Sequence, residues 1–147
     1  AFSNLAAIGV TGVNTSYDLD ALPSALPAAD LPALVPDFPA GAGLPREDGR
    51  GLSTLTYDGA VWRAGLEIDH VLYWTPAVLD AGLTAVLPAL IDAVDAYLAA
   101  VSADGTLGSV LHEPLEVLRV QVGTLERGGV RYYGACFRHR WVRLVGG

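Results

Sequence analysis

The longest regular pattern in the chain is an alternation of apolar and polar residues from Val61 to Trp74. One side of it collects Trp62, Ala64, Leu66, Ile68, His70, Leu72 and Trp74. The other side is polar as far as Asp69 and becomes apolar at Val71 and Tyr73. A period of two over this length predicts a β-strand with one buried face, because a helix would scatter these residues around its circumference.

Two hairpins are predicted around this strand and near the end of the sequence. Asp58-Gly59 precedes the strand, and this dipeptide favours the two-residue turn whose positive backbone angles match strand twist. Later in the chain, residues 116–122 alternate, a turn follows at Arg127-Gly128-Gly129, and residues 129–144 alternate again. The Val61–Trp74 strand is therefore expected to be the second arm of the first hairpin.

A helical pattern lies between the two hairpins. Large apolar residues recur at helical spacing from Val78 to Val101, and polar residues collect on the opposite side. Thr75-Pro76 is typical of a helix start, and Asp104-Gly105 marks the end. Pro88 falls inside the pattern, so we expect it to kink the helix or to divide it in two.

The first forty residues carry weaker patterns. Phe2–Ile8 predicts a short N-terminal helix, and residues 10–17 predict a short strand or extended arm. Prolines recur from Pro23 to Pro39, so no helix can run through that segment. The apolar run Leu31–Phe38 fits an edge strand, where a missing backbone donor is tolerated.

Together these elements predict an α+β fold in a single domain over residues 1–147. It would contain a mostly antiparallel sheet of two long hairpins plus an edge strand, one kinked helix on one face, and a short N-terminal helix. Residues 40–52 are rich in glycine and carry both charge signs, so we expect a mobile loop. Such a loop is either a flexible hairpin tip or a segment that orders against a neighbour.

Charge is distributed unevenly along the chain. The net charge is −7, which argues against general nucleic-acid binding. Six of the nine arginines lie from Arg119 onward with Glu126 as the only acid, which gives about +5 there and about −12 elsewhere. The basic end of one copy can therefore attract an acidic surface of another copy. Alternatively, these arginines only solvate an outward face of the sheet.

No catalytic, cofactor or metal constellation emerges from the sequence. Glu67 and Asp69 lie two apart on one strand face, but carboxylates on a solvated strand are far commoner than an acid–base pair. His70 lies among apolar residues, which favours a hydrogen-bonded core histidine. Cys136 is the only cysteine, and the three histidines are scattered without metal-ligand spacing. We therefore expect a protein that is not an enzyme and that binds neither cofactor nor metal.

Three other readings carry less weight. The segment Arg138–Trp141 mixes arginines with aromatic rings, as in a groove for single-stranded nucleic acid, but the rest of the chain is acidic. Proline and glycine interrupt every apolar run well before the roughly 20 residues of a membrane span, so we expect no membrane segment. A small enzymatic or ligand-binding domain would need a concave pocket around Glu67, Asp69 and His70.

The order and pattern of these elements resemble the tail terminator proteins of long-tailed bacteriophages, also described as tail completion or minor tail protein U-like proteins. The features that carry the resemblance, from about Leu31 to Leu144, are the Leu31–Phe38 strand, the hairpin arm with Trp62, Ala64, Leu66 and Ile68, the helix after Thr75-Pro76, and the last two strands. The resemblance is one of element order rather than of an invariant motif.

This resemblance implies a structural virion protein that forms a hexameric ring at the head-proximal end of the tail. The ring would cap the tail tube, stop its polymerisation and present a docking surface for the head–tail connector. Its partners would be other copies of itself, the tail tube protein and the connector protein, with DNA passing through the ring without sequence-specific binding. The expected location is the virion, and the host cytoplasm during assembly. A neck or head-completion connector protein is the alternative.

By extension, the glycine-rich loop would contact a neighbouring subunit or the tube, and the arginines of the last hairpin would pair with the next subunit. The residues assigned to this self-assembly interface are Arg46, Glu47, Asp48, Arg50, Arg131, Arg138, Arg140 and Arg143.

Overall fold

The computed structural model of the chain describes residues 2–37, 51–58, 61–77 and 82–146. The elements are α1 (Phe2–Ala6), β1 (Thr15–Ser16), the 3-10 turns η1 (Leu19–Ala21) and η2 (Ala28–Asp30), β2 (Ala33–Asp37), β3 (Gly51–Asp58), β4 (Val61–Pro76), α2 (Gly82–Ala103), β5 (Glu116–Arg127) and β6 (Val130–Gly146). Its strands form one sheet, and every pairing except that of β1 with β2 is antiparallel. The predicted α+β class is therefore confirmed.

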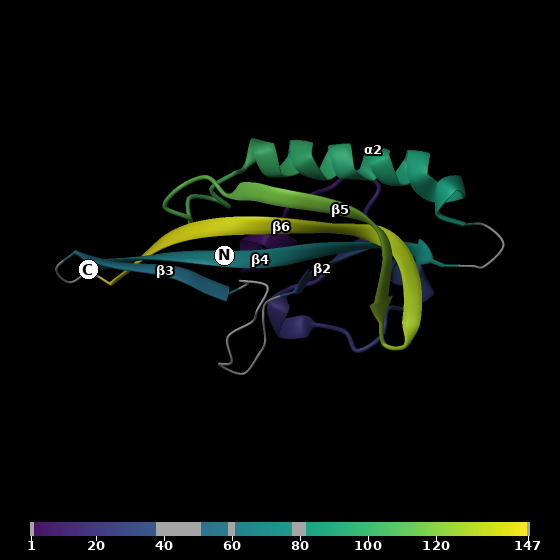
Figure 1. Ribbon diagram of the computed structural model, residues 1–147, viewed down its shortest axis with the longest axis horizontal. Coiled ribbons are helices and arrows are strands. Elements are labelled where there is room, and N and C mark those ends of the chain that lie inside the picture. Colours follow the sequence, from purple (N-terminus) through teal and green to yellow (C-terminus); the bar gives the residue numbers. More distant parts are fainter. Residues whose placement is uncertain (1, 38–50, 59–60, 78–81, 147) are drawn as a thin grey trace.

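The long strand β4 lies at the centre of the sheet (Figure 1). The strand order is β1-β2-β4-β6-β5, and β3 pairs with the first half of β4 while β2 pairs with the second half. On its other side β4 pairs with β6 along almost its whole length. The end formed by β3, β4 and β6 extends beyond the part of the sheet that α2 covers (Figure 1).

The predicted edge strand is β2, and among the described strands only β1 pairs with its outer side, at its start. β1 pairs with Ala33 and Leu34 and then ends. The backbone nitrogen of Tyr17 donates a hydrogen bond to the carbonyl oxygen of Leu34. The backbone groups of Leu34 therefore point toward β1, away from β4. Because backbone groups two residues apart in a strand point the same way, the nitrogen of Pro36 faces the part of this side with which no described strand pairs. Pro36 therefore removes no hydrogen bond from the described sheet.

The predicted helix start at Thr75-Pro76 is wrong. β4 runs through Pro76, because Thr75 and Pro76 pair with Tyr133 and Tyr132 of β6 after an irregularity between Tyr73 and Thr75. Among the described residues the helix begins at Gly82 and continues to Ala103, close to its predicted end. Pro88 lies inside this single helix, so the alternative of two separate helices is excluded.

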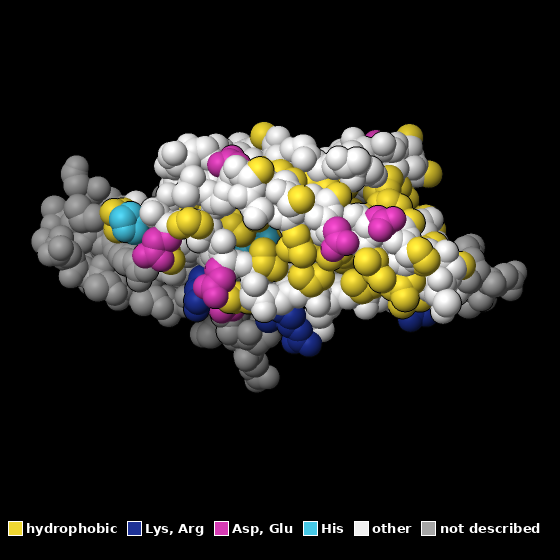
Figure 2. All heavy atoms as spheres, turned by 90° about the horizontal axis from the view of Figure 1, so that it is seen from above, with side chains coloured by type: hydrophobic (Ala, Val, Ile, Leu, Met, Phe, Trp, Pro, Cys, Tyr) yellow, Lys and Arg dark blue, Asp and Glu magenta, His cyan; other side chains and the backbone are white. Residues whose placement is uncertain are grey.

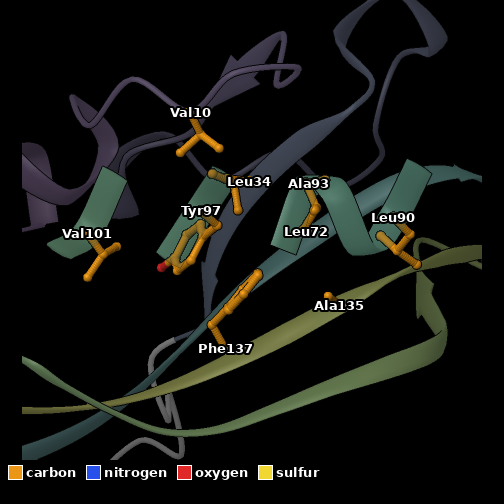
Figure 3. Close-up of a cluster of buried hydrophobic side chains, with 9 residues drawn as sticks. All are labelled: Val10, Leu34, Leu72, Leu90, Ala93, Tyr97, Val101, Ala135 and Phe137. Carbon is orange, nitrogen blue, oxygen red and sulfur yellow. The ribbon is translucent and has the colours of Figure 1, made fainter. Parts of the chain in front are cut away.

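The main core lies between α2 and the sheet (Figure 3). The ring of Tyr97 on α2 stacks on Phe137 of β6, with 3.8 Å between ring centroids. Around this pair the helix buries Leu90, Ala93 and Val101. A neighbouring cluster packs α1 and the segment after α2 onto the same face, with Leu5, Leu107, Leu111, Leu66, Ile68 and Trp141.

The opposite face of the sheet is also covered at the β2 end. Leu26 of the proline-rich segment packs there against Val71, Tyr73 and Tyr132. This second core explains why the polar side of the Val61–Trp74 pattern becomes apolar at Val71. The expectation of one buried face is therefore wrong for this part of β4, which is buried on both faces.

Two predicted connections can be compared with the structure. Asp58 pairs with Val61, so the first hairpin is confirmed with its connection one residue later than predicted. In the second hairpin, Gly128 and Gly129 lie between paired Arg127 and Val130 and have φ angles of 58° and 78°. Of the loop predicted at 40–52, residues 40–50 lie outside the described residues, and the final two belong to β3.

Candidate functional site

Five of the eight residues predicted to form the self-assembly interface cannot be placed by their side chains. Arg46, Glu47, Asp48 and Arg50 lie outside the described residues. Arg143 belongs to β6, where it pairs with Ala64, but its side chain is outside the described part. The structure brings the other three, Arg131, Arg138 and Arg140, onto β6.

Arg138 makes an ion pair within the chain. Its Nε donates to Oδ1 of Asp69 at 3.0 Å, across the β4–β6 pairing that places the two residues opposite each other. Asp69 is only 3% exposed. The expectation that this carboxylate lies on a solvated strand is therefore wrong, and Arg138 neutralises a buried charge.

Arg140 and Arg131 are exposed and are therefore more available to a partner. Nη2 of Arg140 donates to Oε2 of Glu116 at 2.5 Å, and both side chains are about half exposed. Exposed ion pairs of this kind contribute little to stability, so Arg140 can exchange its partner readily. Arg131 lies opposite Glu126 near the hairpin turn.

The arginine and aromatic side chains of the segment Arg138–Trp141 do not form one surface. Arg138 and Arg140 lie on the sheet face away from α2, whereas His139 and Trp141 point into the core and are at most 1% exposed. A groove for single-stranded nucleic acid needs exposed rings on which bases can stack. The strand geometry therefore removes this reading.

The predicted core histidine, His70, takes part in a buried polar cluster. The hydroxyl of Tyr97 lies 2.8 Å from Nδ1 of His70 on β4 and 2.8 Å from Nε2 of His139 on β6. The hydroxyl carries one hydrogen, so it donates to one imidazole and accepts from the other when both rings are neutral. One side chain of α2 thus joins the two central strands.

Burial keeps all three groups of this cluster uncharged. Burial, with a contribution from His139, lowers the pKa of His70 to about 3. Burial also lowers the pKa of His139 to about 4, against the opposing effect of Asp69. The pKa of the Tyr97 hydroxyl is raised well above its usual value by burial.

Among the described residues, the two surface grooves beside α2 do not reach this cluster. Two open grooves of about 310 and 300 Å³ flank α2, one beside Asn4 and Ala100 and the other beside Trp74 and Asp92. Neither is lined by a histidine or by Glu67. Within the described ranges, no group of three histidine, cysteine, aspartate or glutamate residues could hold a metal ion. The hydrogen bonds among His70, Tyr97 and His139 hold α2 in position on the sheet.

A larger feature is the apolar surface that α2 leaves uncovered. α2 is the helix in the described part of the chain that is long and apolar enough to cross a membrane, yet only 22% of its most apolar stretch is buried. It packs on the sheet through Leu90, Ala93, Tyr97 and Val101. Ile91 belongs to the apolar pattern at helical spacing in the sequence, yet it is 47% exposed.

The exposed flank of α2 and the neighbouring edge strand together form one apolar band. It consists of Leu87, Ile91, Val94 and Leu98 of α2 with Val117, Val120 and Val122 of β5. Figure 2 shows hydrophobic side chains gathered along α2 and toward β5. β5 ends the strand order, so in the described sheet its outer backbone groups have no strand partner. Sequence reasoning missed this band, although its signal is visible: the apolar stripe of α2 is wider than one sheet can bury.

Comparison with protein-family models and with curated proteins gives no match, so the function has to be argued from the geometry of the chain itself.

Proposed function

We propose that the chain is a structural protein that assembles with copies of itself into a ring, as the phage tail terminators that it resembles do. The ring would cap a tail tube, stop its polymerisation and offer a docking surface for a head–tail connector. The observation that supports self-assembly best is the apolar band of α2 and β5, which lies beside an unpaired sheet edge. Monomeric proteins seldom leave a contiguous apolar patch of this kind uncovered.

The buried polar groups point in the same direction. His70, Tyr97 and His139 are sealed in the core, and the buried Asp69 pairs with Arg138. These groups rigidify the sheet and helix rather than converge on a pocket. A rigid body with an uncovered apolar surface suits an assembly protein, because little conformational entropy is lost when copies bind.

The proposal is tested by the mass of the purified protein as a function of concentration. Light scattering coupled to size exclusion is expected to give a species of about six subunits, and electron microscopy is expected to give rings with a lumen wide enough for duplex DNA. A monomer at every concentration from the micromolar to the millimolar range would reject the proposal.

Tube capping needs a separate test. Addition of the assembled protein to polymerising tube protein from the same virion is expected to shorten the tubes, with one ring at a tube end. Rings that form but leave the tube length distribution unchanged would retain self-assembly and reject the terminator role.

The arginines of the last hairpin are a further part of this proposal. Replacement of Arg138 and Arg140 by glutamate is expected to weaken the oligomer. Because Arg138 also neutralises buried Asp69, the cleaner test replaces only Arg131 and Arg140, whose side chains are exposed. An unchanged oligomer mass for Arg131→Glu/Arg140→Glu would remove these two arginines from the interface.

A further inference from the structure

We infer that the cluster of His70, Tyr97 and His139 is a pH-sensitive switch built into the fold. When both imidazoles take up a proton, α2 detaches from the sheet, whereas β4 and β6 remain paired. Self-assembly is not required for this switch, because all three residues belong to one chain.

The positions of the hydrogen atoms favour the uncharged form of the cluster. In the neutral cluster one imidazole donates to the Tyr97 oxygen, and the hydroxyl donates to the other imidazole. The second ring nitrogens, Nε2 of His70 and Nδ1 of His139, are buried and have no hydrogen-bond partner among the described residues. A first added proton would therefore sit on one of these nitrogens without an acceptor, which is unfavourable in a buried site.

A second added proton would break one of the two hydrogen bonds. It would have to bind the nitrogen that accepts from the Tyr97 hydroxyl, because the other nitrogen of that ring already carries a hydrogen. Both rings would then direct an N–H at the same oxygen, and the hydroxyl hydrogen would have to turn away from both. Double protonation therefore opposes the docked position of α2.

The nearby titratable groups compensate little for a charged ring. Burial lowers the pKa of both imidazoles, and His139 lowers the pKa of His70 further. Asp69 acts against the lowered pKa of His139, but this carboxylate lies on the opposite face of the sheet, where it is paired with Arg138. Burial, and to a smaller extent Cys136 of β6, raises the pKa of Tyr97, so the hydroxyl keeps its hydrogen.

The other elements around the cluster present apolar residues or carry their charges elsewhere. Val117 of β5 lies opposite His139, and Pro36 of β2 lies opposite His70. α1 has no titratable side chain. On β5, Glu116 and Arg119 pair with Arg140 and Arg138 on the sheet face away from α2. Apart from Tyr97, the titratable residues of α2 and of the segment between α2 and β5 are exposed, namely Asp92, Asp95, Asp104, His112 and Glu113.

α2 is the element that detaches most easily. It buries four of its 22 residues, Leu90, Ala93, Tyr97 and Val101, against the sheet (Figure 3). β4, by contrast, is paired with β6 along almost its whole length. Local opening in proteins begins in the parts with the fewest buried contacts. Detachment of α2 removes the Tyr97 hydroxyl from both rings and lets water approach them.

The size of the pH effect follows from the number of rings. In the docked state His70 and His139 have pKa values of about 3 and about 4, whereas after detachment these values return toward about 6.5. Docking of α2 is therefore most stable above about pH 6.5 and weakens as the pH falls. Each ring multiplies the equilibrium constant for detachment by up to about tenfold per pH unit, so the two rings together give up to about a hundredfold.

Hydrogen–deuterium exchange read by mass spectrometry tests the switch between about pH 4.5 and about pH 7. After correction for the intrinsic exchange rates, peptides of α2 are expected to have an opening constant at least about tenfold larger than peptides of β4 and β6. The opening constant of α2 is expected to rise by up to about a hundredfold per pH unit at the acid end of this range.

Three variants separate proton uptake from packing, and circular dichroism at neutral pH checks that each one folds. His139→Gln removes one titrating ring, so the pH slope is expected to fall from about two protons to about one. Val101→Ala removes a buried contact that does not titrate, so it is expected to raise the opening constant and to keep the slope. Tyr97→Phe is expected to raise the opening constant by at least about tenfold at neutral pH and also to keep the slope, because both rings stay buried.

The wild type alone can overturn the inference, whatever the variants do. A single opening constant shared by α2, β4 and β6 at every pH would mean that the chain opens only as a whole. An opening constant of α2 that does not change with pH would show that the histidines do not control the helix. A pH slope that His139→Gln leaves unchanged would assign the effect to other groups and reject the switch.

Discussion

At the residue scale, the hydroxyl of Tyr97 is the point at which helix and sheet are joined. It contacts one imidazole on each of the two central strands, and its ring stacks on Phe137. Apolar packing alone would allow α2 to slide along the sheet, because such contacts are non-directional. The two hydrogen bonds select one position of the helix.

Tyr97→Phe is expected to lower the free energy of unfolding by about 1 to 3 kcal/mol, because it keeps the stacked ring but leaves two buried imidazole nitrogens without a partner. Urea denaturation followed by fluorescence measures the loss. Tyr17→Phe is the control, since the hydroxyl of Tyr17 bonds Asp30 at a half-buried site that water can reach. Equal losses in the two variants would contradict the proposed importance of the buried cluster.

Stability is expected to fall as the pH drops from about 6.5 to about 5. The unfolded histidines take up protons near pH 6.5, whereas His70 and His139 in the fold do so only near pH 3 and pH 4. Stability from these pKa shifts is therefore complete above pH 6.5 and is lost below it, by up to about 1.4 kcal/mol per pH unit for each histidine.

The variant that tests this is His139→Gln, and urea midpoints at several pH values provide the measurement. His139→Gln is expected to reduce the pH slope by about half, because it removes one of the two buried imidazoles. A wild-type stability that is flat over this pH range would show that the two buried rings do not control it.

At the scale of elements, the pairing of β4 with β6 depends on a close backbone approach at Gly134. A Cβ atom at this position would lie 1.9 Å from the carbonyl oxygen of Leu72 and 2.9 Å from Leu125. Gly134 pairs with Tyr73, next to the irregularity that carries β4 on to Thr75 and Pro76. Glycine is therefore required where the two longest strands change register.

Gly134→Ala is expected to destabilise the protein by about 3 kcal/mol or more, because the backbone of β4 would have to move. The control is Gly123→Ala, on the partner residue in β5, where an added Cβ meets nothing within 4 Å. Gly123→Ala is expected to change the unfolding free energy by less than about 1 kcal/mol. Thermal and urea unfolding compare the two, and similar values would contradict the close approach.

The elements that could be predicted from the sequence are those whose apolar residues recur at a regular spacing within the element itself, or whose turn has a characteristic glycine pair. The alternation in Val61–Trp74 and the glycine pair at Gly128-Gly129 define both hairpins without reference to the rest of the chain. Thr75-Pro76 was misread because its helix-start chemistry is local, whereas its pairing with β6 depends on residues more than fifty positions away. Tertiary pairing outweighed the local preference.

The candidate site was harder to predict for the same reason. The contact of Tyr97 with His70 and His139 joins three distant segments, and no spacing announces it. The ion pair of Arg138 with Asp69 likewise depends on strand register, so charge counts alone could not show that this arginine has a partner. The apolar stripe of α2 can be read from the sequence. The sequence does not show how much of that stripe the sheet buries.

At the scale of the whole molecule, the proposed self-assembly combines the apolar band of α2 and β5 with the exposed arginines Arg131 and Arg140 of β6. Exposed charges are screened by salt, with a Debye length of about 10 Å at 0.1 M. We therefore expect the association constant to fall several-fold when the sodium chloride concentration rises from about 0.05 M to about 0.5 M. Sedimentation velocity measures this change, and Arg131→Glu/Arg140→Glu is expected to show a weaker dependence on salt. Association that strengthens with salt would assign the contact to apolar burial alone.

The position of Pro36 has a consequence for how the sheet meets other chains. Beyond the short β1, no described strand pairs with the outer side of β2, and the buried Pro36 on that side has no amide hydrogen. A foreign strand that tried to add there could not complete its ladder, so this margin resists amyloid-like stacking and strand exchange. The addition of a strand from another chain is therefore disfavoured at β2 and remains possible at β5, the other end of the described sheet. The two edges of the sheet thus differ in their ability to bind another strand.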